Sequence, residues 1–252
     1  MHVFLCKDKQ FDLTIIRWLC YALILLPFSA FSEVKLQVQG LPDNIEQIIA
    51  PHLEPQDVNS ALALRRLIKR TTSQMTKALK SIGYYKSSIS HNLKGDIDAG
   101  DLIFTVELGP PVLITEKRIE LRGDAKDDLA FLLWRENIPV FKGDIFNHAI
   151  YEGLKTQLRT LALSRGYFDA DFSQQEVKVD LKNLSATIAL KFDSGKRYRF
   201  GKVQFNQKEL SESLLERLVT FEFGDLFLSE KITDFNKALL DSEFFDGIQV
   251  SS

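Results

Sequence analysis

The residue types that most often carry out chemistry in proteins are few in this sequence and widely separated. Three of its histidines, His52, His91 and His148, stand alone, outside any His-Glu-x-x-His motif or pair at metal-ligand spacing. The sequence holds no Gly-x-Ser-x-Gly nucleophile motif and no glycine-rich phosphate loop. It therefore predicts no catalytic residues, no metal site, no cofactor and no enzyme activity.

Two short motifs have a simpler interpretation than the one their letters suggest. Residues 96–101 carry three aspartates, as a calcium loop does, but lack its terminal glutamate, and we interpret them as a polar hairpin turn. Residues 122–124 spell Arg-Gly-Asp, an adhesion tripeptide, at a predicted turn, and we interpret the match as chance. Asp124, Asp127 and Asp128 are expected to be acidic residues at the start of a helix.

The composition is that of a folded, mixed-charge protein. Of 252 residues, 45% are hydrophobic and 26% are charged, and the net charge is −2 with a pI near 6.1. A nucleic-acid-binding protein needs a concentrated basic surface, so this balance argues against a nucleic-acid partner.

Residues 1–32 are predicted to be a secretory signal peptide. Basic residues such as Lys7 and Arg17 precede an apolar run of 11 residues at 18–28, which is short of the roughly 20 that a membrane-spanning helix needs. Small residues then lead to a cleavage site after Ser32. The alternative is an uncleaved membrane anchor.

Both cysteines, Cys6 and Cys20, lie within this leader, so the chain from Glu33 onward contains no cysteine. It can have neither disulfides nor thiol chemistry. Such a chain suits an oxidising compartment such as the bacterial periplasm.

A short motif with adjacent aromatic residues recurs three times. It reads SIGYYK at 81–86, SRGYFD at 164–169 and, in degraded form, SEFFD at 242–246. Its turn residues are Gly83, Tyr84 and Tyr85, then Gly166, Tyr167 and Phe168, then Phe244 and Phe245. A sequence repeat of this length indicates repeated structural units.

The spacing of earlier turn residues supports the repeat. Gly40 precedes Gly83 by 43 residues, and Gly123 precedes Gly166 by 43 as well. Gly123 follows Gly40 by 83 residues, and Asn206 follows Gly123 by 83. Asparagine tolerates positive φ better than most residues, so we expect Asn206 to replace a glycine there.

Hydrophobic periodicity predicts the order β-α-α-β-β in each unit. In the first unit the expected elements are strand 34–38, helices 45–53 and 61–82, and strands 85–93 and 102–108. In the second they are strand 113–122, helices 127–137 and 147–165, and strands 170–179 and 185–192. Asn44 is the expected N-cap of the first helix, and Leu129, Leu133 and Ile150 are expected on buried helix faces.

The third unit begins in the same way, with strand 198–205, two helices and a strand from Phe244 through Val250. The sequence ends at Ser252, one strand short, which favours a truncated or fragmentary product. The predicted division is a leader at 1–32 and units at 33–110, 111–195 and 196–252.

The fold class expected is α+β, with tandem units that each place two helices on one face of a three-stranded sheet. Glycine allows the sharp exit from the second helix, and the aromatic residues beside it cover the open end of the core. This structural role for the aromatic turns is favoured over contact with a ligand.

Small open sheets have edge strands whose unpaired backbone groups can accept another extended chain. The candidate binding residues are Ser88, Ile89 and Ser90 in the first unit and Val177 and Val179 in the second. A tandem array of such edges suits a receptor for extended polypeptide. The alternative is a rigid spacer.

The ordered set of motifs resembles POTRA (polypeptide-transport-associated) domains, above all those of TamA-like outer-membrane assembly factors in the BamA/TamA superfamily. The residues that carry the resemblance are stretches 121–125, 166–170 and 192–201, and the similarity covers residues 33–252. In that family the second strand of each unit is the exposed edge and the third lies inside the sheet, which implies that a third unit without it folds poorly.

The resemblance also implies a function and partners. Three POTRA domains would lie on the periplasmic side of the bacterial outer membrane and help to insert clients such as autotransporters, together with a TamB-like inner-membrane partner. The family's membrane β-barrel is missing, because no series of alternating segments follows Val250. BamA-type and two-partner-secretion transporters, or a soluble periplasmic binding module, are the alternatives.

Overall fold

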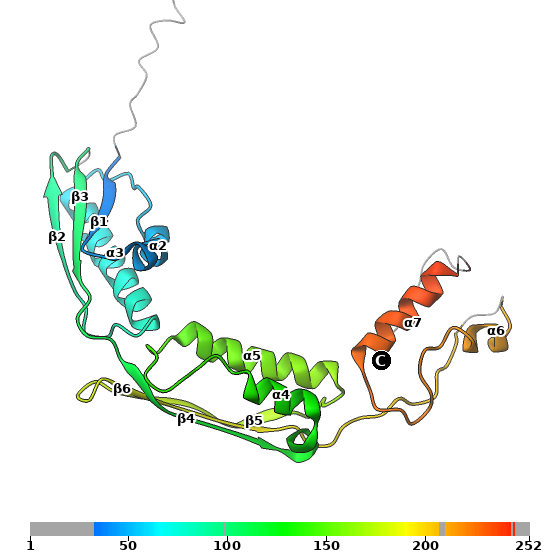
Figure 1. Cartoon of the computed structure of the whole chain (residues 1–252). Coiled ribbons are helices and arrows are strands. Elements are labelled where there is room, and N and C mark those ends of the chain that lie inside the picture. The colour runs from blue at the N-terminus through cyan, green and yellow to red at the C-terminus, as the bar shows by residue number, and fades with distance from the viewer. Residues whose placement is uncertain (1–32, 98, 207–209, 243, 245–252) are drawn as a thin grey trace, which may run out of the picture.

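The computed structural model describes residues 33–97, 99–206, 210–242 and 244. In this part of the chain, two three-stranded sheets, each with a pair of helices, are followed by two further helices. Figure 1 shows three units that follow one another in a curved row. The fold is α+β, as the sequence predicts.

The first unit has the predicted element order. Its elements are β1 (Lys35–Gln39), α2 (Asp43–Ile49), a short 3-10 turn (Ala50–His52), α3 (Ala61–Ser81), β2 (Ser88–Lys94) and β3 (Asp101–Glu107). The sheet order is β1-β3-β2, with β3 parallel to β1 and antiparallel to β2. The last strand in sequence is therefore central, and β2 has a neighbour on one side only.

Local sequence explains the ends of the two helices. The expected N-cap of α2, Asn44, lies inside the helix, because Pro42 is already extended and its carbonyl accepts the first helical hydrogen bonds. Ser60 caps α3, since its Oγ accepts from the Ala63 amide at 3.2 Å. The helix ends before Gly83, which has φ +95°.

The second unit repeats this topology with longer strands. Its elements are β4 (Leu113–Arg122), a 3-10 turn (Gly123–Asp127), α4 (Leu129–Glu136), α5 (His148–Ser164), β5 (Asp171–Asp180) and β6 (Ser185–Asp193). The sheet order is β4-β6-β5, and the helices cover one face of it (Figure 1). Alternate residues of β6 are buried against these helices: Ala186, Ile188, Leu190 and Phe192.

The predicted buried face of α4 needs correction, and so does one residue predicted on the buried face of α5. Leu129 and Leu133 are 67% and 49% exposed. The residue of α4 that points into the core of the second unit is Phe131, which is fully buried. Its ring meets Tyr167 edge-on at 5.4 Å, and this larger aromatic contact sets the inward face of a two-turn helix. In α5, Ile150 is 42% exposed and the neighbouring Tyr151 is buried.

The third unit contains α6 (Glu212–Glu216) and α7 (Ser229–Asp241). Strand 198–205 was wrongly predicted: only one isolated bridge forms there, between Arg199 and Leu226, because no strand of the described residues lies alongside to pair with it. Asn206 does not take the expected positive φ, which among the described residues other than glycine occurs only at Leu184. The strand expected from Phe244 to Val250 lies outside the described residues, apart from Phe244 itself.

Candidate functional site

The predicted binding residues lie on the two edge strands that follow the long helices. Ser88, Ile89 and Ser90 are on β2, and Val177 and Val179 are on β5. In the described part of the chain each strand pairs on one side only, β2 with β3 and β5 with β6. Both strands therefore leave backbone donors and acceptors facing outward.

The edge strand β5 is longer than β2, and its helix-facing and outward-facing side chains differ more clearly in polarity. Val177 lies opposite buried Ile188, and Val179 opposite buried Ala186, so both valines face the helices. Between Phe172 and Gln174 the register shifts, as in a β-bulge. Such a bulge bends the strand at one end and leaves the remaining edge regular.

The edge of β2 is shorter and more polar. The Ser88 hydroxyl donates to Glu107 at 3.2 Å, and His91 lies near the ring of Phe104. Ile89 is half-buried opposite Val106 of β3. This edge has fewer apolar side chains to hold an added strand than β5 has.

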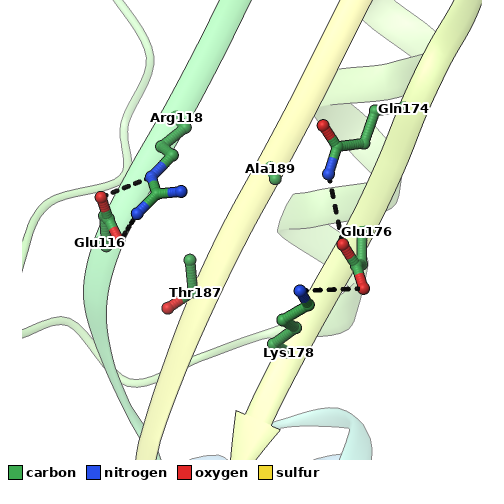
Figure 2. Close-up of a pocket in the computed structure, with 7 residues that line it drawn as sticks. All are labelled: Glu116, Arg118, Gln174, Glu176, Lys178, Thr187 and Ala189. Carbon is green, nitrogen blue, oxygen red and sulfur yellow. Dashed lines mark hydrogen bonds and ion pairs between the residues drawn. The ribbon is translucent and has the colours of Figure 1, made fainter.

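The outer face of the second sheet carries a shallow pocket of about 230 Å³ (Figure 2). Its walls are charged side chains of β4 and β5, and its floor is the short side chains of β6; the lining residues are Glu116, Arg118, Gln174, Glu176, Lys178, Thr187 and Ala189. Arg118 donates to Glu116, and Lys178 pairs with Glu176 at 3.6 Å, each pair within its own strand. The charges are thus already neutralised, which suits a hydrated sheet face.

The first aromatic turn joins the first unit to the second. The Gly83 carbonyl accepts from the Val112 amide at 2.9 Å, and the Val112 carbonyl accepts from the Phe146 amide at 2.9 Å. A Cβ on Gly83 would lie 2.6 Å from the Phe146 carbonyl oxygen. The Tyr85 hydroxyl lies 2.8 Å from Nε2 of His148, the first residue of α5. We call this contact the first joint.

The second aromatic turn makes the same backbone hydrogen bonds with the third unit. The Gly166 carbonyl accepts from the Tyr198 amide at 2.8 Å, and the Tyr198 carbonyl accepts from the Phe227 amide at 3.0 Å. A Cβ on Gly166 would lie 2.6 Å from the Phe227 side chain. Phe168, which is 44% exposed, packs on the rings of Tyr198 and Phe227. This is the second joint.

A buried charge cluster supports the second joint and has no equivalent among the contacts of the first. Asp128, with its side chain 5% exposed, caps α4 by accepting from the Ala130 amide. It also accepts from Arg165 Nε at 2.9 Å, from the Tyr167 hydroxyl at 3.0 Å and from Arg197 at 3.4 Å. These contacts join the start of α4 to the end of α5 and to the linker that leads to the third unit.

Arg197 extends the cluster across the joint. Its Nε donates to the Arg165 carbonyl at 2.7 Å, and its Nη2 donates to the Phe227 carbonyl at 3.0 Å. Its backbone amide donates to Asp124 at 3.1 Å. The acidic residue of the Arg-Gly-Asp tripeptide therefore has a structural partner in the linker.

The environment shifts the pKa values of the cluster in opposite directions. Burial favours the neutral form of Asp128, but hydrogen bonds from Arg165, the Ala130 amide and Tyr167 outweigh it and lower the pKa of this carboxyl. Burial and the nearby Asp128 charge raise the pKa of Tyr167 to about 12.

The sequence predicts Asp128 only as an acidic residue at the start of a helix, and it predicts no role for Arg197. The available signals were an aspartate just before an apolar helix and an arginine two residues after Gly195. Neither signal indicates that the two meet, because 69 residues separate them in the chain.

The described residues offer no metal site and no membrane-spanning helix. They contain no group of three His, Cys, Asp or Glu side chains placed to hold a metal ion. Of their helices, none has the length and apolar character needed to cross a membrane.

Two family models match the chain. Residues 35–108 match the model described as POTRA domain TamA domain 1, and residues 117–195 match POTRA, surface antigen variable number repeat. Together the two matches span more than half of the chain.

Three solved structures are among those similar to this chain. POTRA domains 3–5 of BamA from Haemophilus influenzae are 14% identical, cover 88% of this chain and 91% of their own, and have a TM-score of 0.43. POTRA domains 1–3 of Omp85 from Anabaena are 15% identical, with 87% of each chain covered and a TM-score of 0.34. CdiB from Escherichia coli is 16% identical, covers 66% of this chain and 28% of its own, and has a TM-score of 0.22.

Proposed function

Because the chain belongs to the POTRA-domain proteins, we propose that it is the periplasmic part of a TamA-like outer-membrane assembly factor and binds extended polypeptide at its sheet edges. In this proposal residues 1–32 direct export. The two domains matched by the family models correspond to units 33–110 and 111–195, and 196–252 forms a third POTRA-like unit.

The observation that carries the proposal is the open edge of β5. Its backbone pairs with β6 on one side, and its helix-facing valines, Val177 and Val179, are half-buried rather than fully covered. A strand added there gains backbone hydrogen bonds and apolar contact together. This function is binding without catalysis.

The clients we propose are unfolded outer-membrane proteins such as autotransporters, and the partner is a TamB-like protein anchored in the inner membrane. The match of residues 35–108 to a TamA domain model favours this assignment over a BamA-type or two-partner-secretion transporter. The second joint supports a third unit, because it repeats the hydrogen bonds of the first.

A pair of proline variants at neighbouring residues tests the edge. In an antiparallel strand alternate amides point toward the partner and toward the open side. One of Val177→Pro and Lys178→Pro therefore removes a bond to β6 and unfolds more easily, and the other removes only an outward donor. The variant that removes only an outward donor should keep the wild-type Tm and lose binding to a urea-unfolded autotransporter domain, measured by fluorescence anisotropy.

The same pair on β2, Ile89→Pro and Ser90→Pro, tests the other edge. If the stable proline variants of both strands bind as well as the wild type, edge pairing is wrong. If the wild type binds no unfolded client or TamB-like segment at all, a rigid spacer becomes the better assignment.

A further inference from the structure

Three side chains of α5 form a row on the side of the helix that faces β5. Arg159 places its guanidinium 4.9 Å from the ring centre of Phe172, a β5 residue. Lys155 places its Nζ 4.7 Å from the ring of Tyr151. The pKa of Tyr151 is raised by burial and also by the charges of Glu152 and Glu176, the latter on β5. The other side of α5 meets α4, where Trp134 donates to Gln157.

The two cations of this row are not equivalent. Lys155, only 12% exposed, pairs with Glu152 at 2.7 Å. Arg159 is exposed, and its guanidinium makes no hydrogen bond or ion pair with any residue that the structure describes. One unpaired guanidinium therefore stands beside the edge strand.

The spacing of the row matches an extended chain. Residues four apart on a helix are about 6 Å apart along its axis. Residues two apart on a strand, which share one face, are about 6.7 Å apart. A strand added to β5 would thus place successive helix-facing side chains beside Arg159 and Lys155, with the buried Tyr151 behind them.

We propose that the β5 edge selects extended segments that carry a carboxylate opposite the exposed Arg159 and apolar side chains at the neighbouring helix-facing positions. The selectivity rests on the proposed function, because it assumes strand addition to β5. The occupant is unfolded polypeptide with apolar residues on one face and one acidic residue among them. A planar guanidinium binds a carboxylate through two parallel hydrogen bonds, which gives this position geometric specificity.

The remaining surfaces of the edge add no comparable preference. On the outer face of β5, Glu176 and Lys178 already neutralise each other. A second copy of β5 is a poor occupant, because its helix-facing residues beyond the bulge, Gln175, Val177 and Val179, include no carboxylate.

Synthetic peptides test the selectivity with the full-length chain. The base peptide has nine residues in which valine and threonine alternate. In its variants one valine at a time is replaced by glutamate or, as the uncharged control, by glutamine. One glutamate position should bind about three- to tenfold more tightly than its glutamine counterpart. Isothermal titration calorimetry measures both affinities.

Protein variants locate the effect. Arg159→Gln should abolish the preference for glutamate, and Lys178→Gln, on the outer face of β5, should retain it. Thermal unfolding of both variants shows that the fold is intact, and Arg159→Lys, which keeps the charge without the planar fork, should retain part of the preference.

The possible results separate this inference from the proposed function. If the peptides bind but glutamate and glutamine do not differ, or if Arg159→Gln leaves the difference unchanged, the selectivity is wrong and edge binding stands. If no peptide binds to the folded protein, edge binding fails and the selectivity fails with it.

Discussion

At the scale of single residues, Asp128 is the most consequential polar side chain of the described structure. It caps a helix, accepts from two arginines and a tyrosine, and is almost fully buried. A buried carboxylate of this kind stabilises the fold only while it and its partners are all present. Removing any one of these groups leaves a buried charge that is not fully compensated.

Removing this carboxylate should destabilise the protein strongly. Asp128→Ala is expected to lower the free energy of unfolding by about 3–5 kcal/mol, since it leaves the charges of Arg165 and Arg197 without their carboxylate. Urea unfolding followed by circular dichroism measures the change. The control is Asp127→Ala, an exposed neighbour whose ion pair with Lys126 is at 3.8 Å, and it should cost less than about 0.5 kcal/mol. Equal effects of the two would contradict the role of the cluster.

The same cluster predicts how stability depends on pH. The pKa of Asp128 is lowered in the folded protein, so its contribution is present above the ordinary pKa, near 4, and is lost as the pH falls through the folded value. Asp128→Asn should flatten the fall in Tm below about pH 4.

Tyr167 predicts the opposite dependence, a loss of stability as the pH rises. Its pKa is raised to about 12, so its contribution is present below the ordinary value of 10 and is lost as the pH rises through 12. Tyr167→Phe should remove this alkaline dependence, measured as Tm against pH. A profile between pH 9 and 12 that matches the wild type would contradict it.

At the scale of elements, the glycine of each aromatic turn is needed for two separate reasons. Gly83 has φ +95°, and its α-carbon also faces the next unit at close range. Gly143 has nearly the same φ, +98°, but a Cβ there would meet nothing within 4 Å. This pair of glycines allows strain within the turn to be separated from contact across the joint.

Gly83→Ala should therefore be more harmful than Gly143→Ala. Both changes add about 1–2 kcal/mol of backbone strain, and Gly83→Ala adds a clash with the Phe146 carbonyl of about 1–3 kcal/mol more. Limited proteolysis of the 108–112 linker, together with urea unfolding, measures the difference. Gly166→Ala and Gly224→Ala repeat the comparison at the second joint, and equal effects within each pair would rule out a tight contact there.

Periodicity predicted the strands and long helices of the first two units within about three residues, because their alternation and capping are local. The same reasoning chose the wrong face of α4, since eight residues make only two turns and Phe131 outweighs the leucines. The open edges were expected because small three-stranded sheets have edges, and the family resemblance implied that the second strand of each unit is the exposed one. Arg159 and Arg197 did not, because their roles depend on neighbours 13 and 69 residues away.

At the scale of the whole molecule, the two joints share a backbone pattern but differ in their side chains. The first relies on Tyr85 and His148, and the second adds the cluster in which Arg197 reaches Asp128 and the Phe227 carbonyl. We expect the second and third units to keep a narrower range of relative orientations than the first and second.

Spin-label distances test this difference. With Cys6 and Cys20 replaced by serine, labels at Lys77→Cys, Thr160→Cys and Lys237→Cys report on the three units. Arg197→Gln should broaden the distances between the second and third units and leave those between the first and second unchanged. Tyr85→Phe should do the reverse, to a smaller extent. If Arg197→Gln changes neither distribution, the cluster does not control the joint.

The two joints have one further consequence, which concerns how such a chain can lengthen. The first and second units each present the glycine–aromatic turn that follows their second helix to the backbone at the start of the next unit, so the contact is head-to-tail rather than symmetric. A head-to-tail contact leaves one free half at each end of the array, so a further unit can be added there. Copying one unit's coding segment in tandem therefore supplies both halves of a new connection at once, and the number of units can change by duplication or loss without a new interface having to evolve.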